Sequence, residues 1–120
     1  MFETQMLDMD DMRAAASQAC TLLKVLGNRD RLMLLCQLAQ GEYCVSELEN
    51  LVGIAQPSLS QQLGVLREEQ LVSTRREGKQ IFYSIDSREA RAVMEVLYQQ
   101  FCLAGQEGGP TVVCLDGAGI

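Results

Sequence analysis

Apolar side chains recur at helical spacing along most of this chain, and long alternating segments typical of sheet proteins are absent. The spacing predicts helices over residues 12–26, 29–39, about 46–53, 57–69 and 88–102. Two short segments, 71–75 and 80–85, flank the turn pair Glu77-Gly78 and are predicted to be the strands of a β-hairpin. The pattern therefore predicts a mainly α fold with one β-hairpin, in the order α-α-α-α-β-β-α.

The predicted helices carry end signals. Asn28 is expected to cap the second helix, and Ser46 with Glu49 has the spacing of a capping box at the start of the third. Gly53 is expected to end the third helix, because a residue without Cβ permits a left-handed turn. Pro57 suits the first position of the fourth helix. A short turn is therefore expected between the third and fourth helices.

Apolar faces on these helices predict a single core. They comprise Leu32, Leu35, Cys36 and Ala39 on the second helix, Leu59, Leu63 and Leu66 on the fourth, and Ala92, Val93, Val96, Leu97 and Phe101 on the last. A length of 120 residues supports one domain. We expect that domain to span residues 12–103, between an acidic lead-in at 1–11 and a flexible Gly-rich tail at 104–120.

The composition bounds the compartment and the chemistry. No apolar run approaches the roughly 20 residues needed to span a bilayer, and residues 1–12 are acidic where a signal peptide is basic. We therefore expect a cytoplasmic protein, whose five cysteines are thiols at rest. With no His, no Cys-x-x-Cys pair and no phosphate-binding loop, we predict neither an enzyme nor a cofactor.

The net charge of −6 initially argues against a nucleic-acid partner. Six of the 16 acidic residues, however, lie in segments 1–11 and 106–120, which contain no Lys or Arg. The remainder of the chain therefore carries ten residues of each sign. Phosphate contacts depend on the local field rather than on total charge, so DNA binding is compatible with this composition.

The order of elements over residues 45–83 points to DNA. A short helix, a glycine turn, a polar-faced helix and a basic hairpin follow one another, as in a winged helix-turn-helix. Amide and hydroxyl side chains near the start of the fourth helix have the chemistry that reads base edges, and basic residues near the hairpin tip suit phosphate. The predicted DNA-binding residues are Gln56, Ser58, Ser60, Gln61, Gln62, Arg75, Arg76 and Lys79. The plainer interpretation is a solvated helix face.

Several segments together resemble the ArsR family of bacterial repressors. They are Leu-Gly-Asn-Arg-Asp-Arg-Leu (26–32), Val-Ser-Glu-Leu (45–48), Ser-Leu-Ser-Gln-Gln-Leu (58–63), Leu-Arg-Glu-Glu-Gln-Leu-Val (66–72) and Arg-Arg-Glu-Gly-Lys-Gln-Ile-Phe-Tyr (75–83). The resemblance covers roughly residues 12–103. It implies a homodimer formed by the first and last helices, which places two reading helices on a palindromic double-stranded operator.

The same resemblance bears on the inducer. Metal-sensing members carry Cys-x-Cys at the start of the third helix, but here Ser46 stands where the second cysteine would be, after Cys44. Another metal site of the family needs His, which is absent, so no metal ligands are predicted. Cys36 and Cys102 are placed as in the BigR-like branch, which senses reactive sulfur. This likeness implies that they face each other and form a disulfide or polysulfide bridge that releases DNA.

Alternatives remain for the cysteines. Cys36 taken alone is better explained as a small core residue, and only its pairing with Cys102 favours sensing. An arsenite or soft-metal sensor would use Cys44 with Cys102 or Cys114. Peroxide or nitrosative stress could instead oxidise the Cys36–Cys102 dithiol. Cys44 lies at a helix entry, where the positive end of the helix could lower its pKa. Cys20 is expected to pack in the first helix.

Overall fold

The computed structural model describes residues 8–103, which form five α-helices, one π-helical segment and three strands. The helices are α1 (Met9–Leu26), α2 (Arg29–Leu38), α3 (Val45–Val52), α4 (Ser58–Glu68) and α5 (Arg88–Leu97), and α5 continues as the π-helical segment Tyr98–Leu103. The strands are β1 (Tyr43–Cys44), β2 (Val72–Glu77) and β3 (Gln80–Ile85). The predicted fold class and order of elements are confirmed, with β1 as an addition.

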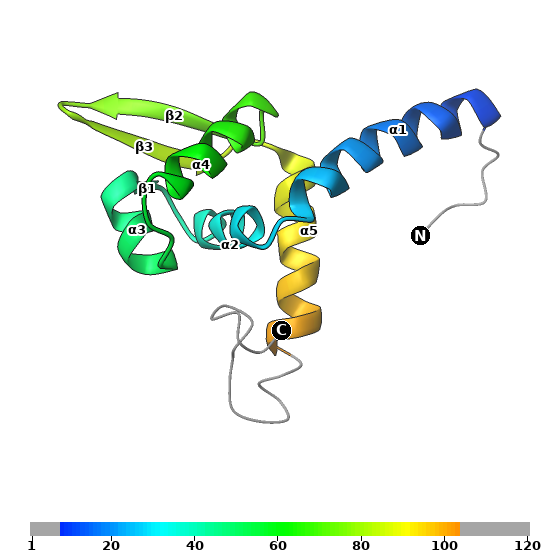
Figure 1. The fold of residues 1–120 in the computed structure, drawn as a ribbon. Helices are drawn as coiled ribbons and strands as arrows, with labels where there is room; N and C mark the ends of the chain where they lie inside the picture. The colour runs from blue at the N-terminus through cyan, green and yellow to red at the C-terminus, as the bar shows by residue number, and fades with distance from the viewer. Residues whose placement is uncertain (1–7, 104–120) are drawn as a thin grey trace.

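Helix α1 extends away from the rest of the molecule, on the side opposite to the β-hairpin (Figure 1). Only its last two residues, Val25 and Leu26, are buried. The helix begins at Met9, inside the segment expected to be an acidic lead-in. Asp10 and Asp11 lie in its first turn, where negative side chains stabilise the positive end of a helix. Asp10 and Asp11 therefore form part of the helix instead of preceding it.

The sheet is antiparallel, with strand order β1-β3-β2. Strands β2 and β3 pair from Val72 opposite Ile85 to Glu77 opposite Gln80, which confirms the predicted hairpin. Gly78 in its two-residue loop has φ +64°, a left-handed conformation that favours glycine. The unpredicted strand β1 pairs Tyr43 with Tyr83. Two residues are too few to show a strand period, so only the tertiary pairing reveals this strand.

The start of α3 differs from the expected capping box. The helix begins at Val45, and the amide N–H of Cys44 donates to the Glu47 carboxylate at 2.9 Å. The prediction that Ser46 and Glu49 form the box is therefore wrong by two residues, because pairing in β1 holds Cys44 extended immediately before the helix. At the other end Gly53 has φ +77° and ends the helix as predicted.

Other helix ends agree more closely with the sequence. The Asn28 side chain accepts a hydrogen bond from the amide of Arg31 at 3.1 Å, which confirms the cap of α2. Pro57 lies one residue before α4 instead of at its first position. Ser87 caps α5, since its hydroxyl accepts from the amide of Ala90 at 3.0 Å. These side chains satisfy backbone donors that the first helical turn leaves unpaired.

The core lies between α2, α3, α4, the sheet and the first half of α5 (Figure 1). Its largest fully buried side chains are leucines: Leu34, Leu35, Leu38, Leu48, Leu59, Leu63 and Leu66. The predicted face of α4 is therefore confirmed. On α2 the buried face is rotated towards Leu34 and Leu38, and Leu32, Cys36 and Ala39 are only partly buried against the core.

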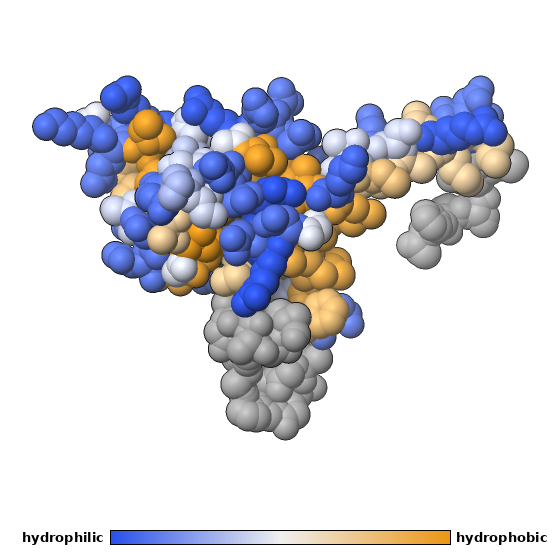
Figure 2. All heavy atoms as spheres, in the orientation of Figure 1, coloured by the Kyte–Doolittle hydropathy of each residue, from blue (hydrophilic) through white to orange (hydrophobic). Residues whose placement is uncertain are grey.

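Helix α5 has two apolar faces. Ala90 and Met94 enter the core, whereas the predicted stripe is only partly covered: Val93 and Leu97 pack against the core, and Val96 and Phe101 are exposed. Apolar side chains are visible along both α1 and α5 in Figure 2. No helix within residues 8–103 is long and apolar enough to cross a membrane. The predicted tail at 104–120 lies outside the described residues.

Candidate nucleic-acid interface and cysteine sites

Helix α4 is anchored by its leucine face and presents polar side chains on the other. Leu59, Leu63 and Leu66 are fully buried, while Ser60 and Gln61 are exposed. Ser58 is half-buried near the start of the helix. The structure thus places the short hydroxyl and amide groups on the outer side of the first two turns. This is the part of a recognition helix that reaches base edges.

Gln56 and Ser60 form a local pair at the start of α4. The side-chain carbonyl oxygen of Gln56 accepts from the Ser60 amide at 3.1 Å and from the Ser60 hydroxyl at 2.7 Å. This pair satisfies a backbone donor in the first turn. It leaves the Gln56 amide nitrogen as a donor and the Ser60 oxygen as an acceptor, and both side chains are exposed.

Gln62 has a different environment from its neighbour Gln61. It is half-buried, and its carbonyl oxygen accepts from Nη1 of Arg31 at 2.9 Å. The same guanidinium donates through Nε to the backbone oxygen of Val25 at 2.8 Å. Gln62 therefore joins α4 to α2 and to the end of α1, so its carbonyl oxygen is engaged inside the protein.

Arg75, on β2, is held by two carboxylates. It donates to both oxygens of Glu42 at 2.9 and 3.0 Å and to Glu77 at 2.8 Å, and its guanidinium lies 4.8 Å from the centre of the Phe82 ring. The hydrogen bond from Arg75 lowers the pKa of Glu42, and the reciprocal bond raises the pKa of Arg75 above its already high value. Arg75 therefore fixes the hairpin to the segment before β1.

Arg76 and Lys79 remain available near the hairpin tip. Both are exposed, and neither forms an ion pair with any group in residues 8–103. Arg76 makes a single 3.4 Å hydrogen bond from Nε to the backbone oxygen of Gly78, which leaves its terminal nitrogens unengaged. Two of the three predicted hairpin cations are thus free for phosphate, while the third is paired.

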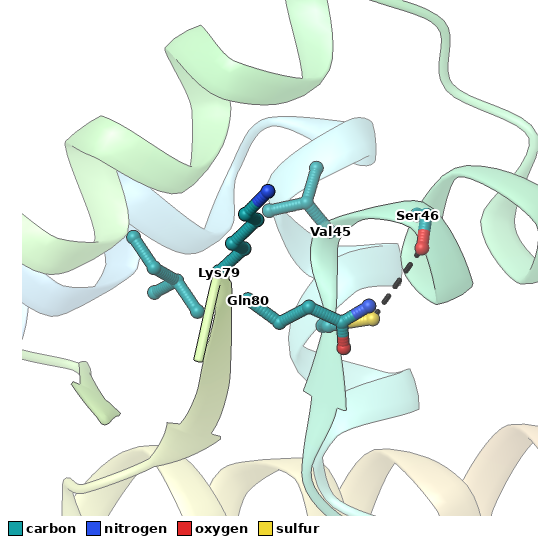
Figure 3. A pocket seen from close by; sticks show the side chains of 6 residues that line it. Val45, Ser46, Lys79 and Gln80 are labelled. Atoms are coloured by element: carbon teal, nitrogen blue, oxygen red, sulfur yellow. Dashed lines mark hydrogen bonds between the residues drawn. The ribbon is translucent and has the colours of Figure 1, made fainter. Parts of the chain in front are cut away.

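Lys79 also borders an open pocket of about 230 Å³ between the hairpin and the start of α3. Its lining residues are Cys44, Val45, Ser46, Lys79, Gln80 and Ile81 (Figure 3). Cys44 is buried, and its sulfur shares a hydrogen bond with the Ser46 hydroxyl at 3.4 Å. Within the described part of the chain, no three His, Cys, Asp or Glu side chains gather in a way that could hold a metal ion.

Cys36 is a half-buried free thiol on α2. It donates to the thioether sulfur of Met94, on α5, at 3.8 Å. Burial raises the pKa of the Cys36 thiol above its ordinary value of 9.0, because the core solvates the thiolate poorly. The structure therefore places Cys36 against Met94 of the last helix, with a smaller thiolate fraction than a reactive cysteine commonly has.

Cys102 is buried in the π-helical segment that continues α5, and it is disulfide-bonded. Cys20, Cys36 and Cys44 are free thiols, so the bond in this structure does not join Cys102 to Cys36. The expectation that all the cysteines are thiols at rest is wrong for Cys102, since disulfide formation follows spatial approach and not composition. Cys20, expected to pack, is exposed on α1.

A recognition helix held by a leucine face, with an exposed basic hairpin beside it, defines a winged helix-turn-helix protein of the DNA-binding type. The chain belongs to the arsR family of bacterial regulatory proteins, whose model matches residues 28–74. The predicted family is thereby confirmed. The relatives described next are named as regulators and not as enzymes.

The relatives are similar over most of their length. The chain is 54% identical over 91 residues to the biofilm growth-associated repressor of Agrobacterium fabrum, covering 76% of this chain and 78% of that protein. It is 50% identical over 93 residues to the repressor of the same name from Xylella fastidiosa, covering 78% and 82%. The crystal structure of the transcriptional repressor BigR from Xylella fastidiosa matches with a TM-score of 0.74 and 49% identity, covering 80% of this chain and 98% of that one.

Two functional candidates were not evident in the sequence. Arg31 and Glu42 are ordinary charged residues at the start and beyond the end of α2, yet each contacts a DNA-reading element. Arg31 occurs within the Leu-Gly-Asn-Arg-Asp-Arg-Leu segment that carries the family resemblance, but nothing in its spacing indicates Gln62 as its partner.

Proposed function

We propose that this protein is a homodimeric repressor that binds a palindromic operator and releases it when reactive sulfur links Cys36 to Cys102. The observation that carries the proposal is the position of Cys36. Its thiol contacts Met94 on α5, the helix whose continuation contains Cys102. The repressor role is supported by the names of the similar proteins from Xylella and Agrobacterium.

For DNA recognition, base edges are assigned to Gln56, Ser58, Ser60 and Gln61. The exposed cations Arg76 and Lys79 are assigned to phosphate, since neither is paired within residues 8–103. Gln62 and Arg75, also predicted from the sequence to contact DNA, are assigned to positioning instead. The carbonyl oxygen of Gln62 is engaged by Arg31, and the guanidinium of Arg75 is engaged by Glu42.

The homodimer is supported by the surface of α1 and α5. Most of α1 makes no contact with the core, and a lone helix gains most of its stability from packing. Large apolar side chains are exposed on both helices: Met9, Met12 and Leu23 on α1, Val96 on α5, and Tyr98 and Phe101 beyond it. A second copy that covers these side chains would bury them and place two α4 helices on one face of DNA.

The disulfide of Cys102 must first be opened by a thiol reductant, with two RSH oxidised to RSSR, which leaves Cys102 as a thiol. The chemistry then balances with one organic persulfide, RSSH, as the oxidant. The thiolate of one cysteine attacks the outer sulfur, the S–S bond breaks, and RSH leaves with the proton of that cysteine. The second thiolate then attacks the cysteine-bound sulfur of the new persulfide and displaces hydrosulfide, which takes its proton and leaves as hydrogen sulfide. The two thiols are oxidised to a disulfide and the outer sulfur is reduced. A second RSSH adds one sulfur atom to the bridge.

Formation of the bridge should move α5 relative to α2. Eight residues separate Met94 from Cys102, a rise of about 12 Å along an α-helix. A disulfide requires the two Cα atoms to approach to about 4.4–6.8 Å. Drawing the end of α5 towards Cys36 would shift the dimer helices with respect to α2, and this shift would change the spacing of the two reading helices on DNA.

The test uses full-length protein reduced with dithiothreitol and a DNA duplex selected by the protein from a random library. Binding is followed by fluorescence anisotropy before and after treatment with glutathione persulfide. The treated protein is then digested, and the masses of its peptides are measured by mass spectrometry. We expect DNA release together with a Cys36–Cys102 cross-linked peptide. Cys36→Ser should keep its DNA affinity and lose the response. Cys20→Ser, which removes an exposed thiol on α1, is the matched control and should respond like wild type.

Release of DNA from Cys36→Ser at the wild-type persulfide concentration would refute the dithiol mechanism. The same assay separates the alternatives from one another. Release of DNA by arsenite, at concentrations at which persulfide releases none, would favour a soft-metal sensor built on Cys44. Release by hydrogen peroxide, with the same cross-linked peptide and no response to persulfide, would favour a peroxide sensor.

A further inference from the structure

The guanidinium of Arg31 joins three helices. Arg31 lies in the first turn of α2, where its own amide is capped by Asn28. Its Nε donates to the backbone oxygen of Val25 near the end of α1 at 2.8 Å, and its Nη1 donates to Gln62 on α4 at 2.9 Å. A single side chain therefore connects the helix that projects from the molecule, the helix that carries Cys36 and the recognition helix.

Both contacts are chemically well matched. The Val25 oxygen is one of the last four carbonyls of α1, which have no partner within the helix, and a cation is favoured at that negative end. Guanidinium donors lie in one rigid plane, so the two bonds together fix the direction in which the Gln62 oxygen is held. Arg31 and Gln62 are both half-buried, which shields this bond from solvent more than an exposed pair.

The leucine face of α4 does not by itself fix the rotation of this helix about its axis, and the contact with Arg31 can fix it. Burial of Leu59, Leu63 and Leu66 fixes how deeply the helix sits, but apolar contacts have little directionality. A hydrogen bond is directional, so the Arg31–Gln62 bond opposes rotation of α4 about its axis. Gln61 is the preceding residue on the helix, and its direction into the groove changes with that rotation.

We propose that Arg31 is a positioning residue that sets the rotation of the recognition helix and transmits displacement of α1 and α2 to it. The transmission deepens the repressor function proposed above and rests on it. The positioning of α4 in the DNA-binding state does not depend on the inducer. Cys36 contacts α5 from the same helix, so a bridge at Cys36 would act on the element to which the recognition helix is tied.

The experiment measures DNA affinity of reduced full-length protein at several salt concentrations for Arg31→Gln, Arg31→Lys, Gln62→Met and the double variant Arg31→Gln/Gln62→Met. Arg31→Gln should weaken binding about tenfold, the scale of one hydrogen bond to a charged group. Gln62→Met should weaken DNA binding similarly. The double variant should bind DNA no more weakly than whichever single variant has the lower affinity. Arg31→Lys should recover part of the loss.

The salt dependence separates positioning from direct phosphate contact. Positioning leaves the slope of log affinity against log salt unchanged, whereas loss of one phosphate contact from each subunit of the proposed homodimer reduces the magnitude of the slope by about 1.8. Arg29→Gln, which removes an exposed cation from the same turn of α2, is the matched control and should stay within about twofold of wild type. Circular dichroism checks folding, and Gln62→Met retains a readout if the Arg31 variants unfold.

Additive losses, a lowered salt slope for Arg31→Gln, or wild-type affinity for Gln62→Met would each overturn the positioning role. The transmission is tested by treating Gln62→Met with glutathione persulfide, which should change its affinity less than that of wild type. An equal change would overturn the transmission alone. If wild type itself does not respond to persulfide, the proposed sulfur-sensing function is refuted. The positioning role of Arg31 is then still decided by the DNA affinities of the reduced variants.

Discussion

Substitution of the two neighbouring hairpin arginines tests how the basic hairpin contacts DNA. Arg75→Ala and Arg76→Ala each remove one positive charge from β2, so their effects on the general field are matched. They differ in contacts, because Arg75 is paired with Glu42 and Glu77 while Arg76 forms no ion pair within residues 8–103. We expect Arg76→Ala to remove a phosphate contact. Arg75→Ala should instead loosen the hairpin.

The magnitude follows from counterion release. Each phosphate contact contributes about 0.9 to the slope of log affinity against log salt. In the proposed homodimer, which has two hairpins, Arg76→Ala removes two such contacts and reduces the magnitude of the slope by about 1.8. Over a fourfold rise in salt, from about 50 to 200 mM, wild type should therefore lose about twelvefold more affinity than Arg76→Ala. Arg75→Ala should lose affinity at every salt concentration with the wild-type slope.

The assay is fluorescence anisotropy of a selected duplex titrated with reduced protein at four or more salt concentrations between those limits. Lys79→Ala provides a second exposed cation and should reproduce the slope of Arg76→Ala. The reasoning is refuted if Arg75→Ala lowers the slope as much as Arg76→Ala does. That result would mean that Arg75 exchanges Glu42 for phosphate when DNA binds.

Two further predictions concern the core and the Cys36 thiol. Leu63→Ala removes a side chain that is 1% exposed and should cost about 2–5 kcal/mol of unfolding free energy, measured by urea denaturation. The same substitution at Leu51, which is 54% exposed, should change stability by less than about 0.5 kcal/mol, and equal losses would contradict the assigned core. Iodoacetamide should modify exposed Cys20 before Cys36, and the Cys36 rate should still be rising at pH 9.0, because burial raises the pKa of that thiol. A Cys36 rate that reaches its plateau below pH 9.0 would show that the thiolate is stabilised instead.

Signals that act over a few residues were readable from the sequence. Asn28 caps α2 and Gly53 ends α3 because each acts on backbone groups within its own turn. The leucines of α4 are buried because their spacing gives one apolar face, and any fold that uses this helix must cover that face. These local rules, with the order of the elements, were sufficient to predict the winged helix-turn-helix fold.

Features that depend on contacts with a distant part of the chain could not be predicted from the sequence. Strand β1 exists only through its pairing with β3, and this pairing moved the start of α3 away from Ser46. The sequence grouped Arg75 with Arg76 and Gln62 with Gln61, since adjacent residues of the same type have the same chemistry.

Only the tertiary structure separated the members of each pair. It placed Glu42 beside Arg75 and Arg31 beside Gln62, across more than thirty residues in each case. The sequence by itself thus determined which elements form and which chemistry they offer to DNA. The tertiary structure decided which of those polar groups remain available, because a hydrogen bond engages whichever partner the fold brings within about 3 Å, whatever its distance along the chain.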